Sequence, residues 1–457
     1  MILLAKPQAH RALLSIAFPL ILANITTPIL GLVDTAILGR MDGIHYLAGA
    51  AIASLILTQL YWICGFLKMS LTGLSAQSKS KSDDERLRVL MQGVYLAFVL
   101  ACLILLFQSP VLQAGLWFAK AQIAVEQASE AYFYVRVWGA PAALINLAIV
   151  GWLIGQQQGR LILLLQVFVN VLNIIASLIF VYVFDWGVQG VAAGTVLAEY
   201  SLLLVSLVYI NKALVRLYLR RVWLNFTGLK PLLSLNSNIL IRNLALQFTL
   251  AFVTLKGAQY GAQAAAINAI LMQFFALIAL GLDGIANAVE ALVGEKAGEK
   301  AGEKTDKVHS IFPMQTHPNE NAVVKQVQLG ILYSTLVAII YSVIFFVFGS
   351  AIIRLLSDQA VLLDAMQAYT WIIILLPLIA HWCFLFDGVY VGLTQGKTMR
   401  NNMLISTFFG FLPVYYLLES TTNLENQAIW LAMFSFLAFR GFGLAWHFVR
   451  VLAPKYN

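Results

Sequence analysis

Long apolar blocks are the feature of this 457-residue sequence that most limits its fold. Runs such as 104–107, 161–165 and 372–378 are nearly continuous, whereas the strands of an outer-membrane barrel alternate apolar and polar residues. Hydrophobic residues make up 61% of the chain and charged residues 11%, against about 25% charged in a soluble domain. This composition excludes a soluble globule and a disordered chain. The pattern predicts an all-α integral membrane protein.

Twelve segments are long and apolar enough to cross a bilayer as helices. Several of them run beyond the minimum length, and the second, eighth and tenth are rich in small residues, which favours contact with other helices or a cavity over contact with lipid. The expected spans are 13–38, 46–76, 89–108, 131–155, 161–183, 188–210, 236–256, 264–293, 326–348, 365–394, 401–418 and 427–448.

The distribution of the 29 lysine and arginine residues predicts the orientation of these spans. With the N-terminus inside, 21 of them fall in inner segments and four in outer segments. Positive residues concentrate on the cytoplasmic side of membrane proteins. We therefore expect both termini to be cytoplasmic and the number of spans to be even. The net charge of +8 is explained by the positive residues that orient the spans, so we expect no nucleic-acid partner.

A basic connection at 211–235 divides the spans into two groups of six, an N-lobe at 1–210 and a C-lobe at 236–457. A short repeat supports this division. Residues 151–160 and 388–397 both read G-x-x-x-G-x-x-Q-G-[R/K], at a constant offset of 237 residues. Because an even number of spans separates the copies, the two halves are predicted to be parallel repeats, one of the plans of secondary transporters.

A second connection, at about 294–325, contains Gly-Glu-Lys-Ala units of period four. Glycine at every fourth position and mixed charge are typical of a flexible linker. We expect this segment to be a flexible cytoplasmic loop.

Acidic residues inside apolar spans are the best candidates for function, because burying a charge in a membrane is costly. Asp34 lies near the outer end of the first span, which also carries Pro19 and Pro28. Proline removes a backbone hydrogen bond and bends helices. Asp34 is therefore a candidate site for a proton or cation, the alternative being an interfacial carboxylate in water. The two prolines predict a bend in this helix that is either a hinge responding to the charge of Asp34 or a static kink.

Further polar residues lie in the fifth and sixth spans at helical spacing. Asn170, Asn173 and Ser177 share one helix face, and Thr195 and Glu199 share another. In the second half, Asp283, Glu290 and Asp387 form a possible C-lobe site, for which ion pairing within the lobe is the structural alternative.

Motifs of enzymes and nucleotide-binding proteins do not occur in the sequence. It has no Walker A, G-x-S-x-G or HExxH pattern, so we expect neither an enzyme nor an ATP site. The three cysteines and six histidines show no metal-ligand spacing. No cofactor or metal is expected beyond a coupling ion, H⁺ or Na⁺.

The quoted residues, taken together, resemble the multidrug and toxic compound extrusion (MATE) family, in particular its DinF-like branch. Matching stretches extend over nearly the whole chain and include 31–36, 69–77, 188–200, 282–290 and 386–388. The resemblance implies a V-shaped pair of six-helix lobes around a central cavity. It also implies that Asp34 couples transport to an ion, with Asn173 and Thr195 around it and Pro19 at the bend. Some relatives have aspartate where this chain has Ser177, so Asp34 acts here with neutral partners unless Glu199 contributes.

These features predict an antiporter that exports small organic, often cationic, compounds across the bacterial inner membrane as a monomer. One carboxylate among neutral ligands favours H⁺ over Na⁺. The alternative is a flippase of lipid-linked saccharide precursors, which needs a basic central cavity and for which Lys68 and Arg242 are the candidates. A membrane enzyme and a channel are less consistent with the absence of an acid–base cluster and of a filter motif.

Overall fold

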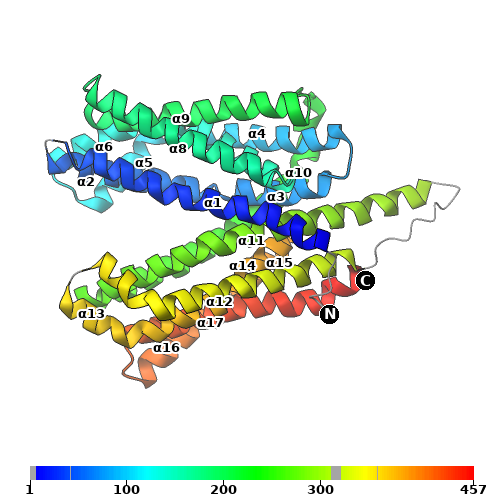
Figure 1. Ribbon diagram of the computed structural model, residues 1–457. Helices are drawn as coiled ribbons and strands as arrows, with labels where there is room; N and C mark the ends of the chain where they lie inside the picture. The colour runs from blue at the N-terminus through cyan, green and yellow to red at the C-terminus, as the bar shows by residue number, and fades with distance from the viewer. Residues whose placement is uncertain (1–6, 42, 310–320, 358, 457) are drawn as a thin grey trace. The chain divides into compact units, whose positions relative to one another are not determined.

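A computed structural model describes residues 7–41, 43–309, 321–357 and 359–456 (Figure 1). Helices dominate this part of the chain. Its α-helices are α1 Pro7–Leu38, α2 Ile44–Ile63, α3 Phe66–Ser78, α4 Asp83–Leu106, α5 Gln108–Ala119, α6 Ile123–Arg136, α7 Ala140–Gly155, α8 Gly159–Tyr182, α9 Gly187–Tyr209, α10 Phe226–Gln259, α11 Ala262–His309, α12 Ala322–Leu356, α13 Ala360–Met366, α14 Thr370–Gly392, α15 Gly396–Ile405, α16 Leu412–Thr421, α17 Asn426–His447 and α18 Ala453–Tyr456.

Twelve helical segments within the described residues are long and apolar enough to cross a membrane. This confirms the predicted all-helical membrane fold and the number of spans. Several spans consist of two consecutive helices. For example, α6 and α7 follow one another through a 3₁₀ turn at Val137–Gly139. The short break costs little because each helix still satisfies its own backbone hydrogen bonds.

The chain divides into two compact units. The N-terminal unit contains Leu22–Ser234, and the C-terminal unit contains Leu235–Asn457 together with the chain before Leu22. One division falls at the end of the basic connection. The other falls inside α1, between Pro19 and Pro28. The first turns of α1 therefore belong to the C-terminal unit, which the expected division into 1–210 and 236–457 does not include.

Each unit is organised around one central helix that is buried along most of its length. In the N-terminal unit this is α7, which packs against α3, α4 and α9. In the C-terminal unit it is α14, which packs against α11, α12 and α17. The most apolar windows of the spans containing them are 72% and 67% buried, more than those of most other spans. These two helices carry the sequence repeat.

The described parts of the segment predicted as a flexible loop at 294–325 are helical, so the prediction of a loop is wrong for these residues, while its flexibility and its side of the membrane stay predictions. Helix α11 continues to His309 and α12 begins at Ala322, while residues 310–320 lie outside the described part of the chain. Alanine, glutamate and lysine are good helix formers. Lys296 also pairs with Glu299 one turn later at 2.8 Å. These preferences outweigh the cost of one glycine in four.

Candidate functional site

Asp34 lies one turn before the C-terminal end of α1, in the N-terminal unit. Its side chain is half-buried. Its Oδ1 atom is buried and has no hydrogen-bond partner among the described residues. A buried carboxylate oxygen is normally hydrogen-bonded, because desolvation without compensation is costly. Asp34 therefore has an acceptor available for a proton, a cation or a substrate group.

A part-buried ion pair lies within electrostatic range of Asp34. Arg136, the last residue of α6, donates two hydrogen bonds to the Glu199 carboxylate of α9, at 2.9 Å from Nη1 and 2.6 Å from Nη2. The Arg136 guanidinium also lies over the Tyr61 ring, 5.7 Å from its centroid. The pair neutralises Glu199. Asp34 adds a second carboxylate near a single arginine, so this cluster has an excess of negative charge.

Arg136 is the functional candidate that the sequence analysis missed. Arg136 lies within the expected span 131–155, near its start. The signal was nonetheless present, because a glutamate and an arginine inside neighbouring spans are expected to pair. What the sequence did not provide was the contact between α6 and α9 that brings Arg136 and Glu199 together.

The polar residues of α8 form a buried row, as their spacing predicts. Asn170, Asn173 and Ser177 are buried, and Ser177 Oγ donates to Asn173 Oδ1 at 3.2 Å. Asn170 Oδ1 accepts from Gln166, while Asn170 Nδ2 is buried without a partner in the described chain. These amides offer neutral donors and acceptors inside the N-terminal unit.

Helix α9 approaches this row closely because Gly194 has no side chain. A Cβ at Gly194 would lie 2.7 Å from the backbone N of Ser177. Thr195 is half-buried, and its hydroxyl donates to its own helix at Val191 O. Within the described residues, Asp34 makes no hydrogen bond to Asn173 or Thr195. The roles of these residues as partners of Asp34 stay predictions.

Both prolines of the predicted hinge lie inside α1. Pro19 is buried and belongs to the C-terminal unit, whereas Pro28 is exposed and belongs to the N-terminal unit. Each proline removes one backbone donor from the helix. The division between the two units therefore lies between two positions of α1 at which a backbone hydrogen bond is missing.

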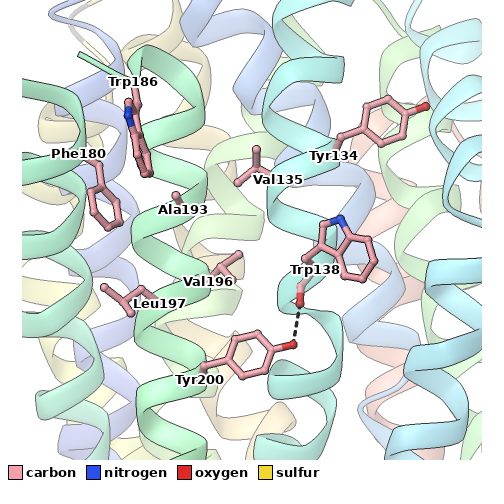
Figure 2. A pocket seen from close by; sticks show the side chains of 9 residues that line it. All are labelled: Tyr134, Val135, Trp138, Phe180, Trp186, Ala193, Val196, Leu197 and Tyr200. Atoms are coloured by element: carbon pink, nitrogen blue, oxygen red, sulfur yellow. Dashed lines mark hydrogen bonds between the residues drawn. The ribbon is translucent and has the colours of Figure 1, made fainter. Parts of the chain in front are cut away.

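An aromatic hollow of about 600 Å³ lies on α6, α8, α9 and the 3₁₀ turn that follows α6, and its lining residue Tyr200 directly follows Glu199 (Figure 2). Trp138 and Trp186 are half-exposed in it, and the Tyr200 hydroxyl donates to Trp138 O at 3.0 Å. The other lining side chains are Tyr134, Val135, Phe180, Ala193, Val196 and Leu197. None of the predicted site residues lines this hollow. Its surface is apolar and lies on membrane-spanning helices.

The C-terminal unit contains a different buried cluster. Arg242 of α10 and Arg440 of α17 each donate from Nη2 to the same oxygen of Asp387 on α14, Oδ2. All three residues are buried. Two guanidinium groups thus hold the negative charge of Asp387. Asp387 therefore forms ion pairs within the C-terminal unit, which is the alternative to an ion-binding role that the sequence left open.

The other two acids of the possible C-lobe site both lie on α11. Asp283 is exposed and within electrostatic range of Arg440, whereas Glu290 is buried two turns further along. Among the described residues, no group of three or more His, Cys, Asp or Glu side chains is arranged to hold a metal ion.

The repeat motif produces close helix packing in both units. A Cβ at Gly155 would lie 2.6 Å from Thr72 O, and one at Gly392 would lie 2.5 Å from Glu290 O. Glycine at these positions therefore lets α7 contact α3 and α14 contact α11 through backbone atoms. Gln157 and Thr394, which are 237 residues apart, both have positive φ, at 61° and 53°. The repeat is a structural one.

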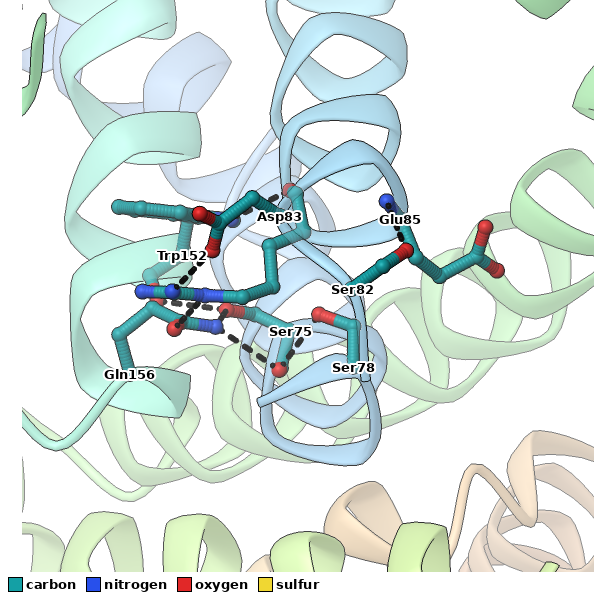
Figure 3. Close-up of polar contacts among 8 residues, drawn as sticks. Ser75, Ser78, Ser82, Asp83, Glu85, Trp152 and Gln156 are labelled. Carbon is teal, nitrogen blue, oxygen red and sulfur yellow. Dashed lines mark hydrogen bonds and ion pairs between the residues drawn. The ribbon is translucent and has the colours of Figure 1, made fainter. Parts of the chain in front are cut away.

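A polar network fixes the end of α7 in the N-terminal unit (Figure 3). Gln156 Nε2 donates to the backbone and side-chain oxygens of Ser75, at 3.0 and 2.9 Å. Ser75 Oγ donates to Trp152 O at 2.7 Å, and Arg86 donates to Gln156 Oε1 at 2.8 Å. These bonds join α7 to α3 and α4, so the network holds the three helices together.

The basic connection contacts α4. Gln92 Nε2 donates to Trp223 O at 2.8 Å and to Gly228 O at 3.1 Å. The Tyr218 hydroxyl donates to the Asp84 carboxylate, and this hydrogen bond raises the pKa of Tyr218. Arg220 reaches the other carboxylate oxygen at 3.3 Å. These contacts hold residues 218–228 to the N-terminal unit.

The fold and these buried charges define a multi-pass membrane transporter built from two helical units. Comparison with known proteins identifies the family. A sequence model described as MatE matches residues 19–179. The chain is 35% identical to DNA damage-inducible protein F of Escherichia coli strain K12, over 96% of this chain and 92% of that protein. The chain belongs to the MATE family of multidrug and toxic compound transporters, in its DinF-like branch, and is a transporter and not an enzyme.

Two further likenesses extend over most of the chain. It is 24% identical to the chloroplastic protein DETOXIFICATION 44 of Arabidopsis thaliana, over 95% of this chain and 81% of that protein. The structure of a multidrug resistance MATE family transporter in an outward-facing conformation matches it with a TM-score of 0.81 at 17% identity. That match covers 98% of this chain and 97% of the other and shows the shared fold.

Proposed function

We propose that this transporter exports small organic cations from the cytoplasm in exchange for protons that bind at Asp34. The observation that carries the proposal is the buried Oδ1 of Asp34, which has no partner in the described chain. Arg136 is engaged in a two-bond contact with Glu199 and does not satisfy that oxygen. A carboxylate in this situation can be occupied either by a proton or by a cationic substrate, and this competition is the basis of exchange.

The cycle uses α1 as the moving element. A proton from the outer side neutralises Asp34, and the substrate loses its electrostatic partner and leaves. Protonation also removes the electrostatic attraction that orients the Asp34 carboxylate. The segment of α1 between Pro19 and Pro28 can then change its bend. Return to the inward state releases the proton to the cytoplasm. The gradient supplies about 1.4 kcal/mol per pH unit and about 2.3 kcal/mol per charge per 100 mV.

A proton suits this site better than Na⁺. A sodium ion needs several oxygen ligands around it. The oxygens of the two expected partners are already hydrogen-bonded, because Asn173 accepts from Ser177 on the same helix and Thr195 donates to the backbone of its own helix. In the C-terminal unit, two arginines contact Asp387, so the cluster as a whole is positive and does not attract a cation. We therefore place coupling in the N-terminal unit.

The proposed location rests on the distribution of positive residues and on the similarity to a bacterial protein. The positive-inside distribution supports a bacterial inner-membrane protein with both termini in the cytoplasm. The similarity to the Escherichia coli protein supports a bacterial setting. Each chain has its own Asp34 cluster within one unit, so we propose that the monomer is the transporting form.

Efflux of a cationic dye from proteoliposomes tests this function. Wild-type protein, Asp34→Asn and the control Asp364→Asn are compared, the control being an exposed acid in the C-terminal unit. A pH gradient and a sodium gradient are imposed separately. We expect transport driven by the pH gradient alone, lost in Asp34→Asn and unchanged in the control. Sodium-driven transport that survives Asp34→Asn would contradict the proposal. Absence of dye transport under either gradient would favour the flippase alternative.

A further inference from the structure

In the buried cluster of Arg242, Asp387 and Arg440, the guanidinium group of Arg440 has more hydrogen-bond donors than partners among the described residues. A guanidinium group has five N–H donors and no acceptor. Arg440 is 4% exposed, and its side chain donates one hydrogen bond within the described chain, to Asp387 Oδ2. Its Nε is buried and has no acceptor among the described residues. Such a deficit is costly in an apolar interior, and an anion is the group that relieves it.

The same cluster concentrates positive charge. Asp387 receives both guanidinium groups on one oxygen, so two positive charges share one negative charge in direct contact. The groups facing Arg440 from the packed helices are Asp387 and Cys383 of α14, Arg242 of α10 and Asp283 of α11. Asp283 is exposed, so water weakens the effect of its charge on the cluster without removing it. The buried part of the cluster therefore favours an added anion.

We propose that Arg440 and Arg242 form an anion-binding site in the C-terminal unit that takes a small carboxylate, or the carboxylate group of an organic molecule. In the free protein Asp387 occupies the site as an internal competitor. A planar carboxylate matches the guanidinium fork and can accept two parallel hydrogen bonds, which a spherical ion cannot. The proposal goes beyond the export cycle, because it involves neither Asp34 nor the N-terminal unit.

Removal of the internal competitor provides the test. Wild-type protein, Asp387→Asn and the double variant Asp387→Asn/Arg440→Gln are purified as full chains in detergent. Their Tm values are measured in sodium formate and in sodium chloride of equal ionic strength. The difference between the two salts isolates carboxylate binding from general salt effects.

We expect formate to raise the Tm of Asp387→Asn by several degrees more than that of the wild type, because ligand binding to the folded state stabilises it by mass action. The double variant should lose this formate-specific rise. A purely structural triad predicts that Asp387→Asn is destabilised equally in both salts. That outcome, or the same rise in the single and double variants, would overturn the site.

A second variant covers the case in which Asp387→Asn does not fold. Asp283→Asn changes an exposed side chain and removes a negative charge that opposes anion binding. Titration calorimetry with benzoate should then show an affinity at least about threefold higher than in the wild type. Unchanged affinity, or no saturable binding to either protein, would contradict the proposal. Asp34→Asn serves as the separating control, because its anion response should equal that of the wild type whatever its transport activity.

Discussion

The two units contain charged clusters of different composition, part-buried in the N-terminal unit and buried in the C-terminal unit. In the N-terminal unit, Arg136 donates two hydrogen bonds to Glu199. The carboxylate of Asp34 lies within electrostatic range and has a buried oxygen with no partner in the described chain. In the C-terminal unit, two arginines share one oxygen of Asp387. The comparison teaches that the repeated architecture fixes helix packing, while the charged residues differ between the units, which is why we propose a different ligand for each.

The largest expected effect concerns the two kinds of ion pair. Arg136→Gln leaves Glu199 buried without its counter-charge, and breaking a buried pair in this way costs about 3–5 kcal/mol. Arg242→Gln leaves Asp387 with Arg440, so the expected loss is about 1.5–3 kcal/mol, the value of one hydrogen bond to a charged group. Unfolding of both variants in detergent, followed by circular dichroism, checks the order.

The matching double variant sharpens this result. Arg136→Gln/Glu199→Gln removes both charges and should recover most of the stability lost in Arg136→Gln, because the main penalty is the orphaned carboxylate. Equal losses for Arg136→Gln and Arg242→Gln would mean that the clusters do not differ in the proposed way.

A smaller effect is expected from the repeated glycines, which should behave alike in both units. Gly155→Val and Gly392→Val each force a side chain against backbone oxygens, at Thr72 and Glu290, and overpacking of this kind costs about 1–3 kcal/mol. Gly349→Ala is the control, since a Cβ there meets nothing within 4 Å and alanine favours a helix. Thermal unfolding of the three variants measures the contrast. If the valine variants behaved like the control, the packing role of the repeat would be wrong.

The smallest effect belongs to the connection on α4. The neutral phenol of Tyr218 donates to Asp84, so its pKa is raised above the unfolded value of about 10. A raised pKa means that this contact stabilises the folded segment fully below that value and is lost as pH rises through the folded pKa. Hydrogen exchange of residues 215–230, taken relative to the intrinsic rate at each pH, should therefore accelerate at alkaline pH in the wild type. In Asp84→Asn the exchange should already be faster at neutral pH and depend less on pH, and an identical profile would contradict the contact.

The fold was predictable because its causes are local. Apolar length and the absence of charge define each span, and the glycine repeat at Gly155 and Gly392 marks the helices at the centre of each unit. The one wrong prediction, a loop at 294–325, came from weighing glycine above the helix-forming residues around it. The pair of Lys296 and Glu299 shows which preference prevailed.

The candidate site was only partly predictable, because its partners come from distant parts of the sequence. Helical spacing predicted the buried row of Asn170, Asn173 and Ser177. It did not predict that Arg136 pairs with Glu199, 63 residues away, or that Arg440 joins Arg242 at Asp387. Such contacts depend on which helices pack together, and no periodicity encodes that. The coupling role of Asp34 stays a prediction.

Proton release on substrate binding tests the central claim most directly. A cationic dye is added to purified wild-type protein and to Asp34→Asn in weakly buffered detergent solution, and the pH change is recorded. If the dye and a proton compete for Asp34, the wild type releases up to one proton per bound dye and Asp34→Asn releases none. Equal release by the two proteins, with dye bound to both, would show that the exchange site lies elsewhere.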